Sequence, residues 1–531
     1  TQEKGMRSPL TGDNFEKDIF VGNRPKFGLT GYGDNTEYKL NSRDAEVIVL
    51  IDGVQREFYS LDPENIESIS IQKDALSAIS LGMRSSRSVL LITTKKPVEQ
   101  GFQISFTGKF GIQKPIGVPN ALSADRYAYL LNEEMQNDGK PAIYSLEDFE
   151  KYRNHSSPYT HPDINWFDAV MKDYSTIQSY NLNATGGGKV AKYYVGLGYM
   201  EEDGLFKSSK VDNYETNARY QRYLITSRIN VNVTNEFKVG VSLMGRIEDG
   251  NQPGATSAEI LKNIFETANN AYPITNPNGT FGGNTSYKEN LMAQTRNSGY
   301  IKDNRRDGMA AITLDYNLGK FVKGLSARAQ GNITTQSVSA IQRSKKDPVY
   351  QFKPSTGPGV ADTYDRFGNV QIQNNNYKSV GNYQQMYGQI GLNYITTLGL
   401  HTIGGSAFAD LQEELLNYDL PRRPANRNAK ANYNYDMKYF AEAAISRGYY
   451  NRYRPGKRWG TFYAFGLGWD ISRENFFNTL DWLNQFKVRA VYGNTGNGVD
   501  NSGYYTWRQT YKDDGNSYPM GYEKSNGGSV R

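Results

Sequence analysis

The sequence predicts a membrane all-β protein, a large antiparallel transmembrane β-barrel with a small α+β plug domain in its lumen. From about residue 101 onward, long segments alternate apolar and polar residues, as strands with one apolar and one polar face do. Short and very long connections alternate between these segments, which is typical of outer-membrane barrels. The preceding residues lack this pattern. We therefore expect a plug domain at residues 1–100 and a partial transmembrane barrel with long extracellular loops at residues 101–531.

The composition of the 531 residues narrows the class of protein. No window approaches the ~18 consecutive apolar residues of a transmembrane helix, so any membrane span must be built of strands that close on themselves. Cysteine is absent, which excludes disulfides, thiolate metal sites and cysteine nucleophiles. The net charge of +6 is small for this length, and no dense basic tract indicates a nucleic-acid partner. Because no nucleophile-elbow, phosphate-loop or paired-histidine motif is visible, we expect no enzyme activity, no cofactor and no metal.

The first part of the chain has the pattern of a compact α+β unit. Residues 46–51 form an apolar run that ends at Asp52 and Gly53, as a strand followed by a turn does. Asp62 followed by Pro63 marks a helix start, with the aspartate as N-cap and the proline at the first helical position. The other expected elements are a strand at 68–71, a short helix at 73–79 that ends near Gly82, and a strand at 89–94.

The second part has the pattern of a series of β-hairpins. Apolar and polar residues alternate at 225–233 and at 237–243, on either side of a turn at 234–236. The same pattern predicts hairpins at 310–318 with 325–331, 387–394 with 400–408, and 180–185 with 193–199. The long, polar connections are 115–174, 249–306, 338–382 and 414–433. A soluble sandwich would have more uniform loops at its two ends.

Aromatic residues gather at the ends of the strand-like segments, as at Tyr193 and Tyr194, Tyr449 and Tyr450, and Trp459. Such residues form interfacial girdles in membrane barrels. Ordinary cross-strand aromatic pairs would give the same pattern. For the set as a whole, we favour girdles.

The number of strands is too small to close a barrel around the first domain. About twelve strand-like segments lie between residues 101 and 495, and about twelve strands close at a backbone radius of roughly 12 Å. A domain of ~90 residues has an outer radius of roughly 16 Å and does not fit inside. About 22 strands give a radius of roughly 22 Å, which is wide enough. Either the first domain is not a plug, or roughly ten strands of the barrel lie outside this chain, and we favour the second interpretation.

Several motifs follow one another along the chain: Asp52-Gly53-Val54, Asp62 to Ile69, Lys73-Asp74-Ala75, Leu91 to Lys96, Arg454 to Gly460 and Phe486 to Asn497. In this order they resemble the motifs of SusC/RagA-like TonB-dependent outer-membrane transporters. The resemblance covers an N-terminal plug plus about half of the barrel. One departure is the family's glycine-rich turn, which is here Gly82 to Ser88 with two glycines fewer, so this turn has less freedom to adopt positive φ.

The resemblance implies TonB-dependent active import of a large nutrient across the cell outer membrane, through a multi-pass β-barrel surrounded by outer-membrane lipid. The ligand would be an oligosaccharide or oligopeptide, captured together with a SusD-like surface lipoprotein. The TonB complex would then pull the plug open. Two alternatives from other classes are a surface β-rich glycan-binding module without transport and a passive porin, although a porin has no use for an α+β domain.

The polar residues of the plug motifs are candidates for gating. They are Asp52, Gly53, Glu67, Lys73, Asp74 and Arg84. Ion pairs between such residues and the barrel wall would hold the plug in place and break when it opens. The alternative is the solvated surface of a small domain, and for Asp52 with Gly53 a simple turn.

Aromatic residues in the expected outer loops are candidates for ligand binding. They are Tyr159, Trp166, Tyr350, Phe352, Tyr364 and Tyr377. Aromatic rings stack on sugar faces and contact peptide side chains, whereas the alternative is that the loops pack on themselves. His155 and His161 lie in the first long loop without metal-ligand spacing, so we interpret them as polar loop residues.

Overall fold

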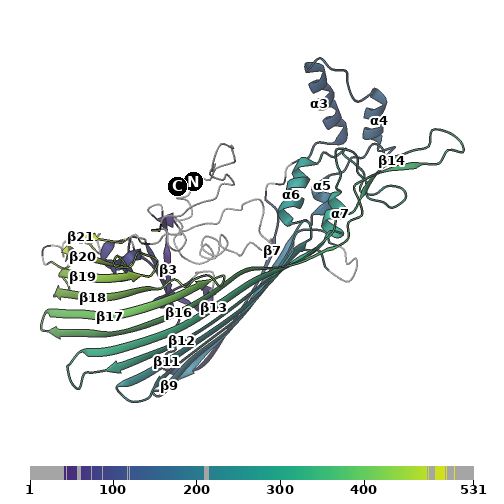
Figure 1. Ribbon diagram of the computed structural model, residues 1–531. Coiled ribbons are helices and arrows are strands. Elements are labelled where there is room, and N and C mark those ends of the chain that lie inside the picture. Colours follow the sequence, from purple (N-terminus) through teal and green to yellow (C-terminus); the bar gives the residue numbers. More distant parts are fainter. Residues whose placement is uncertain are drawn as a thin grey trace, which may run out of the picture.

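The computed structural model (Figure 1) consists of a small N-terminal domain, a large curved antiparallel sheet and a layer of helices at one end of that sheet. It describes residues 41–42, 45–56, 61, 63–72, 74–86, 88–116, 118, 120–208, 215–474, 476, 485–496, 498 and 507–508. None of the helices in these ranges is both long and apolar enough to cross a membrane.

The N-terminal domain is built on a four-stranded sheet with the order β4-β3-β6-β5. Its elements are β1 (Asn41–Ser42), β2 (Ala45–Glu46), β3 (Ile48–Ile51), β4 (Val54–Gln55), η4 (Pro63–Asn65), β5 (Ile66–Gln72), α2 (Ala75–Ala78), η5 (Ile79–Arg84) and β6 (Val89–Thr94). β3 and β6 pair in parallel, and the other pairs of this sheet are antiparallel. Apolar residues of β3 and β6 form its core, with Ile51 and Ile92 fully buried.

Most elements expected in this domain are present with small changes in their bounds. The strand at 89–94 is confirmed residue for residue. The helix expected after Asp62 is only the single 3-10 turn η4, because the alternating residues that follow already enter β5 at Ile66. Asp62 itself lies outside the described residues.

The described residues of the second part of the chain form one sheet of thirteen antiparallel strands, which we call the wall, where about twelve were expected. Its strands are β7 (Gln100–Gln113), β8 (Ser175–Gly187), β9 (Ala191–Asp203), β10 (Arg219–Asn232), β11 (Phe237–Pro253), β12 (Gly299–Asn317), β13 (Leu325–Ser344), β16 (Asn374–Leu398), β17 (His401–Leu416), β18 (Pro424–Tyr435), β19 (Tyr439–Tyr450), β20 (Trp459–Asp470) and β21 (Lys487–Asn494). Each wall strand pairs with the next wall strand along the chain, so the wall is an up-and-down meander.

The connections of the wall differ at its two ends. At one end they are tight turns such as 188–190, 233–236 and 399–400, although 471–486 at the same end is longer. At the other end lie the long segments 114–174, 254–298 and 345–373. The fourth long connection expected, 414–433, was wrong: β17 continues to Leu416 and β18 begins at Pro424, so only seven residues connect them.

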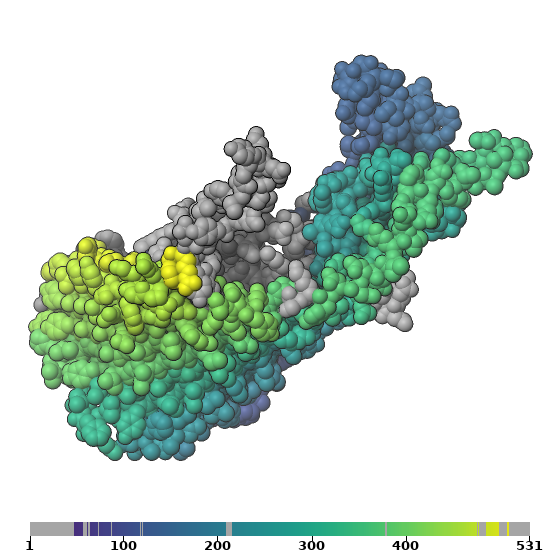
Figure 2. All heavy atoms as spheres, in the orientation of Figure 1, coloured from purple at the N-terminus to yellow at the C-terminus, as the bar shows by residue number. Residues whose placement is uncertain are grey.

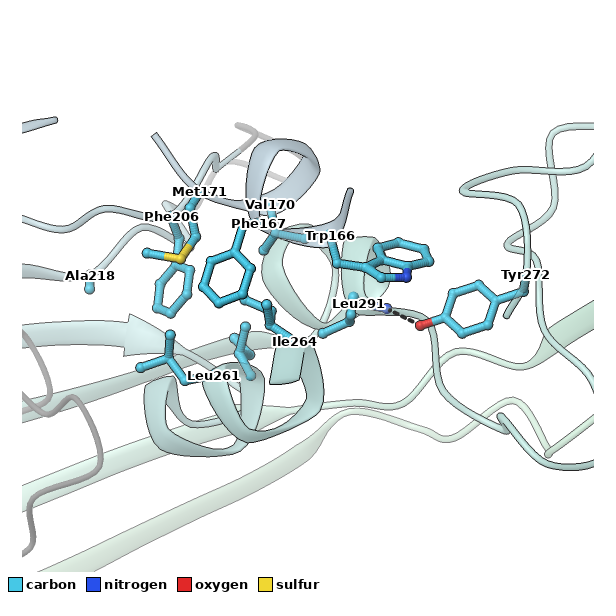
Figure 3. Packing of buried hydrophobic residues seen from close by; sticks show 11 residues of the cluster. Trp166, Phe167, Val170, Met171, Phe206, Ala218, Leu261, Ile264, Tyr272 and Leu291 are labelled. Atoms are coloured by element: carbon cyan, nitrogen blue, oxygen red, sulfur yellow. Dashed lines mark hydrogen bonds between the residues drawn. The ribbon is translucent and has the colours of Figure 1, made fainter. Parts of the chain in front are cut away.

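The long connections form a separate layer, which we call the outer layer; Figure 2 shows it rising from one end of the wall. It contains α3 (Ala124–Asn137), α4 (Leu146–Asn154), α5 (Trp166–Val170), α6 (Ser257–Glu266), α7 (Leu291–Arg296) and the hairpin of β14 (Val349–Lys353) with β15 (Thr363–Phe367). Figure 3 shows its core, in which Trp166 lies with Ile264 and Leu291 from the second long connection and with Phe206 from the connection between β9 and β10. Three separate connections therefore share one hydrophobic core.

The outward face of the wall is an exposed apolar band bounded by aromatic rows. Near the outer layer, Tyr180, Tyr199 and Tyr223 on adjacent strands stand ring beside ring, with centroids 6.4 and 5.0 Å apart. Near the tight turns, Tyr439 stacks on Trp469 at 6.3 Å. The two aromatic rows lie about ten residues apart along β11. Ten residues of a strand tilted by about 40° rise about 26 Å, which is close to the ~25 Å apolar band of membrane barrels.

The N-terminal domain lies on the concave side of the wall (Figure 1). It contacts Lys109 on β7 at one flank of the wall and Arg489 on β21 at the other. Thirteen strands laid flat would span roughly 60 Å, about twice the diameter of such a domain. Both contacts are possible only because the wall curves around the domain.

Candidate functional site: the interface between the N-terminal domain and the wall

Asp52 and Gly53 form the two-residue turn between β3 and β4. Both residues have positive φ, 50° and 86°, which is the geometry of a type I′ hairpin turn and explains the Asp-Gly sequence. The turn directs the Asp52 carboxylate toward the end of β6, where it accepts hydrogen bonds from the Thr94 backbone N–H (3.0 Å) and hydroxyl (2.6 Å). The turn expected here is present, and it positions a charged group.

The same carboxylate pairs with the wall. Arg228 on β10 donates from Nη2 to Asp52 Oδ2 at 2.8 Å and from Nη1 to the Lys95 carbonyl at 3.3 Å. The Arg228 side chain is 11% exposed and that of Asp52 is 26% exposed, so water screens this pair only in part. Burial raises the pKa of Asp52, but the Arg228 guanidinium and the Thr94 hydrogen bonds outweigh it and hold that pKa below its usual range.

Two further contacts join the N-terminal domain to the same flank of the wall. Asn65 is buried; its Oδ1 lies 2.5 Å from the Tyr194 hydroxyl on β9 and its Nδ2 lies 3.4 Å from Thr226 Oγ1 on β10. Glu64 forms an ion pair with Lys109 on β7 at 3.5 Å. This flank is therefore joined through polar and charged groups.

The opposite flank is joined through α2 and η5, mainly by apolar packing. Leu76 and Ile79 are buried against Ala444 on β19 and Ala464 on β20. Asp74 caps α2 by accepting from the Ser77 backbone N–H at 2.8 Å.

Asp74 also pairs with Arg489 on β21. One carboxylate thus starts the helix and ties it to the wall.

Glycines allow the backbones of η5 and the wall to approach closely. Gly82 has φ 57°, and a Cβ built there would lie 2.2 Å from Asn426 Oδ1 on β18. Met83 lies against Gly448 and Gly496, whose added Cβ atoms would meet its backbone at 2.9 and 2.7 Å. The glycine-poor turn of the sequence therefore keeps one positive-φ glycine at the position that faces the wall.

Arg84 connects the N-terminal domain with a third part of the wall. Its Nη1 donates to Gln55 on β4, and its Nη2 donates to Gln412 Oε1 on β17 at 3.3 Å. Glu414 lies 3.9 Å from the same guanidinium. The arginine side chain is mostly buried, so these groups replace the water that a free guanidinium would hold.

The remaining gating candidates differ in their surroundings. Gly53 completes the turn, and an added Cβ would find open space. Glu67 is exposed on β5, and within the described residues its carboxylate has no ion pair. Lys73 lies outside the described residues. Asp52, Asp74 and Arg84 are thus the candidates that contact the wall.

Of the six aromatic candidates, three lie together. The Tyr159 ring meets Phe352 edge-on at 6.1 Å, and Phe352 lies 5.5 Å from Tyr364 across the β14–β15 hairpin. Tyr350 is half-buried at the base of this hairpin, where its backbone pairs with residues 281–283.

The other two aromatic candidates are elsewhere. Tyr377 is exposed on β16, apart from that cluster in the β-ladder. Trp166 is only 1% exposed and donates from Nε1 to the Ala268 carbonyl at 3.0 Å. The expectation that its ring faces a ligand is corrected, because the outer layer uses it as a core residue.

The histidines of the first long connection have structural roles. His161 Nε2 lies 2.8 Å from Asp148 Oδ1, and Asp148 also closes the capping box of α4 with Ser145. The Ser145 backbone N–H bond, with His161 contributing and burial opposing, lowers the pKa of Asp148 to about 2. His155 ends α4 in the left-handed conformation.

Sequence reasoning missed the wall half of every contact. Arg228 was visible as a charged residue on the polar face of the strand at 225–233, but no local signal indicates which inward residue meets the N-terminal domain. Arg489 and Gln412 were missed for the same reason. Strand alternation predicts the face of the sheet, whereas the partner depends on how the wall curves.

The chain is similar to proteins of known class. No protein-family model matches it. TonB-dependent receptor P39 of Formosa agariphila is 24% identical over 469 residues, which are 85% of this chain and 42% of that protein. TonB-dependent receptor SusC of Bacteroides thetaiotaomicron is 22% identical over 476 residues, 84% of this chain and 44% of SusC. Among solved structures, the RagAB peptide importer in its open-open state superposes with a TM-score of 0.66 at 16% identity, over 92% of this chain and 57% of that chain.

These comparisons confirm the predicted resemblance to SusC/RagA-like TonB-dependent transporters. The predicted fold class, an antiparallel barrel wall with a small plug, is confirmed with it. The chain spans less than half the length of the curated relatives it matches.

Proposed function

We propose that this chain is the plug domain, at residues 1–100, and part of the barrel, at residues 101–531, of a multi-pass outer-membrane transporter that imports a large nutrient in a TonB-dependent manner. Its role is transport and not catalysis. The observation that carries the proposal is that one small domain contacts both flanks of a curved wall, from Lys109 to Arg489. A domain held in this way obstructs the lumen, so passage requires that it move. A passive porin has no need for such an obstruction.

The gating residues in this proposal are those that join the plug to the wall. Asp52 and Arg84 form polar links to β10 and β17, and Asp74 links to β21. A pulling force supplied by the TonB complex would break these links one after another, because each involves only one or two hydrogen bonds. Water entering the gap would then stabilise the separated charges. In this proposal Gly53 completes the turn that positions Asp52, and Glu67 and Lys73 supply charge around these links.

Ligand capture is assigned to the outer layer. Tyr159, Phe352 and Tyr364 offer a compact group of rings, with Tyr350 at the base of the same hairpin and Tyr377 on β16. Such rings suit the faces of an oligosaccharide or the side chains of an oligopeptide.

The proposed partner at this end is a SusD-like surface lipoprotein. The apolar side chains Tyr129, Leu130 and Leu146 on α3 and α4 are exposed and suit its docking. The TonB complex would act from the opposite side of the membrane.

A simple experiment separates this proposal from a surface glycan-binding module. We expect the protein to fractionate with outer membranes, to require detergent for extraction and to migrate at a heat-dependent position on a gel. Recovery in aqueous buffer without detergent would contradict membrane insertion. Growth of a deletion strain on defined oligosaccharides and peptides identifies the cargo.

A reversible tether tests whether the plug must move. The chain has no cysteine, and the Ala75 Cβ lies 3.0 Å from a Cβ built on Gly493, so the double variant A75C/G493C can form a disulfide across the interface after a small shift. We expect oxidised cells to lose growth on the cargo and reduced cells to regain it. Each single variant serves as the matched control. Full import through the oxidised, tethered protein would contradict the proposal.

A further inference from the structure

A pair of glycines interrupts the outward face of the wall. Gly245 on β11 lies directly opposite Gly308 on β12 in the strand register, and both face outward with their apolar neighbours Leu243 and Ile312. Glycine in the interior of a strand weakens the strand and often marks a place where a ligand approaches closely. Neither glycine has positive φ, so backbone conformation does not require them.

These glycines form the floor of a continuous groove. One hollow of about 910 Å³ and a second of about 490 Å³ share Gly245, Gly308, Ile225 and Thr335 in their lining. The side of the groove formed by β8–β10 is apolar, with Leu182, Leu197 and Ile225 as its members. The groove lies within the apolar band, so the surrounding medium in a bilayer is hydrocarbon. This hydrocarbon fills the groove, because an empty groove would lose dispersion contacts along its length.

The end of the groove nearest the outer layer is polar and cationic. Arg306 lines it with a side chain 45% exposed, and its guanidinium is fixed by Asp249 Oδ1 at 2.7 Å and by the Glu248 carbonyl at 2.8 Å. Lys302 follows on the same face of β12, and Arg343 is exposed on β13 beside it. This face therefore carries Arg306, Lys302 and Arg343 with one carboxylate, Asp249, on β11–β13. On the neighbouring strands, Arg219 of β10 pairs with Glu201 and Asp203 of β9.

This cationic end lies at the level of the tyrosine row. The register of the wall places five residues of adjacent strands in one row across the sheet. From β8 to β12 they are Tyr180, Tyr199, Tyr223, Ile247 and Arg306. Tyrosine rows mark the membrane–water interface. The groove therefore runs from the interface on the side of the long loops into the hydrocarbon.

We infer that the groove is a binding site for the phosphorylated glycolipid of the outer leaflet, with an acyl chain over Gly245 and Gly308 and a phosphate at Arg306. The inference rests on the proposed outer-membrane function, since only there does this face meet that leaflet. The fixed, half-exposed guanidinium matches a phosphate in charge and in hydrogen-bonding geometry. The glycine floor gives one acyl chain a defined path. A second outward glycine pair, Gly331 and Gly388, lies on β13 and β16, so the feature that distinguishes this site is the fixed guanidinium of Arg306 at the end of the floor.

Native mass spectrometry of the full chain, purified from outer membranes in mild detergent, tests the inference. Lipid A, phosphatidylglycerol and phosphatidylcholine are added separately to the wild type and to G308L, which fills the floor. G388L is the matched control, because Gly388 also faces outward and its added Cβ meets open space. R306Q removes the charge, and R328Q is its control, since Arg328 is 50% exposed and pairs with Asp315 at 3.7 Å toward the other end of the wall.

We expect lipid A to bind the wild type, G388L and R328Q equally, to be lost in G308L, and to bind R306Q about tenfold more weakly. Equal lipid A binding by G308L and G388L, equal binding of phosphatidylglycerol and lipid A, or a protein dimer that G308L dissociates would each overturn the inference. Heat-dependent gel migration of every variant verifies folding. Extraction without detergent would overturn the proposed function itself, whereas a membrane-embedded protein that retains lipid A in G308L overturns only the lipid site.

Discussion

The ion pair between Asp52 and Arg228 predicts a measurable coupling energy between the plug and the wall. We consider Asp52→Ala, Arg228→Ala and the double variant. Asp52→Ala alone also removes both hydrogen bonds to Thr94, so its total effect exceeds that of the pair. The double-mutant cycle cancels those bonds and isolates the interaction across the interface.

The expected coupling is about 2 kcal/mol. A hydrogen bond to a charged group contributes about 1.5–3 kcal/mol, and the low exposure of both side chains places this pair toward that range. A solvated ion pair contributes only about 0.2–1 kcal/mol. Glu64 and Lys109 form such a pair across the same interface, at 3.5 Å with side chains 30% and 49% exposed, and they provide a matched control.

Hydrogen exchange of the backbone amides of β3 and β6 measures the free energy of opening the plug in each variant. The Ile48 and Asp52 amides, which bond to Ser88 and Ile92 carbonyls at 2.9 Å, are the reporters. We expect the cycle for Asp52 and Arg228 to give clearly more coupling than the cycle for Glu64 and Lys109. Equal values in the two cycles would refute the argument that partial burial strengthens this link.

Other variants probe separate parts of the structure. Because the pKa of Asp52 is lower in the docked plug than when free, its contribution is present at neutral pH and is lost as the pH falls below about 4, so β3 protection should be constant from about pH 7 to 5 and then decline. Gly82→Ala should weaken docking by about 2 kcal/mol in the same exchange assay, since strain at φ 57° adds to the overlap with Asn426, whereas Gly53→Ala should cost only the strain of about 1 kcal/mol. Trp166→Ala should destabilise the outer layer by about 3–5 kcal/mol, seen as early loss of near-ultraviolet circular dichroism while the strand signal persists.

Much of the wall could be predicted because its chemistry repeats locally. In the hairpin of β10 and β11, the turn at 233–236 and the inward position of Arg228 follow from alternation. β18 was not predicted as a strand. Several of its outward positions hold small residues, Ala425, Ala429 and Ala431, in place of large apolar ones, and most of its inward positions hold asparagine. Its two faces therefore differ little in hydrophobicity, and the segment has the composition of a loop.

The candidate site was predicted only on the plug side. Asp52 and Asp74 stand in recognisable turn and cap sequences, so local rules identify them. Their partners, Arg228 and Arg489, lie far away in sequence and meet them only when the wall has curved. Trp166 shows the converse: its position in a long polar connection indicated exposure, but this connection, the second long connection and the one between β9 and β10 together supply enough apolar residues to bury it.

The shared core of the outer layer constrains how this end of the molecule can change. Trp166, Phe206 and Ile260 come from three connections that are separated by whole hairpins, yet all three are buried in one core. Grafting a single loop from a relative would expose the remaining two to water and lose the packing energy of all three. Variation at this surface must therefore be concerted across the three connections, because a change in one of them leaves its packing partners in the other two unmatched.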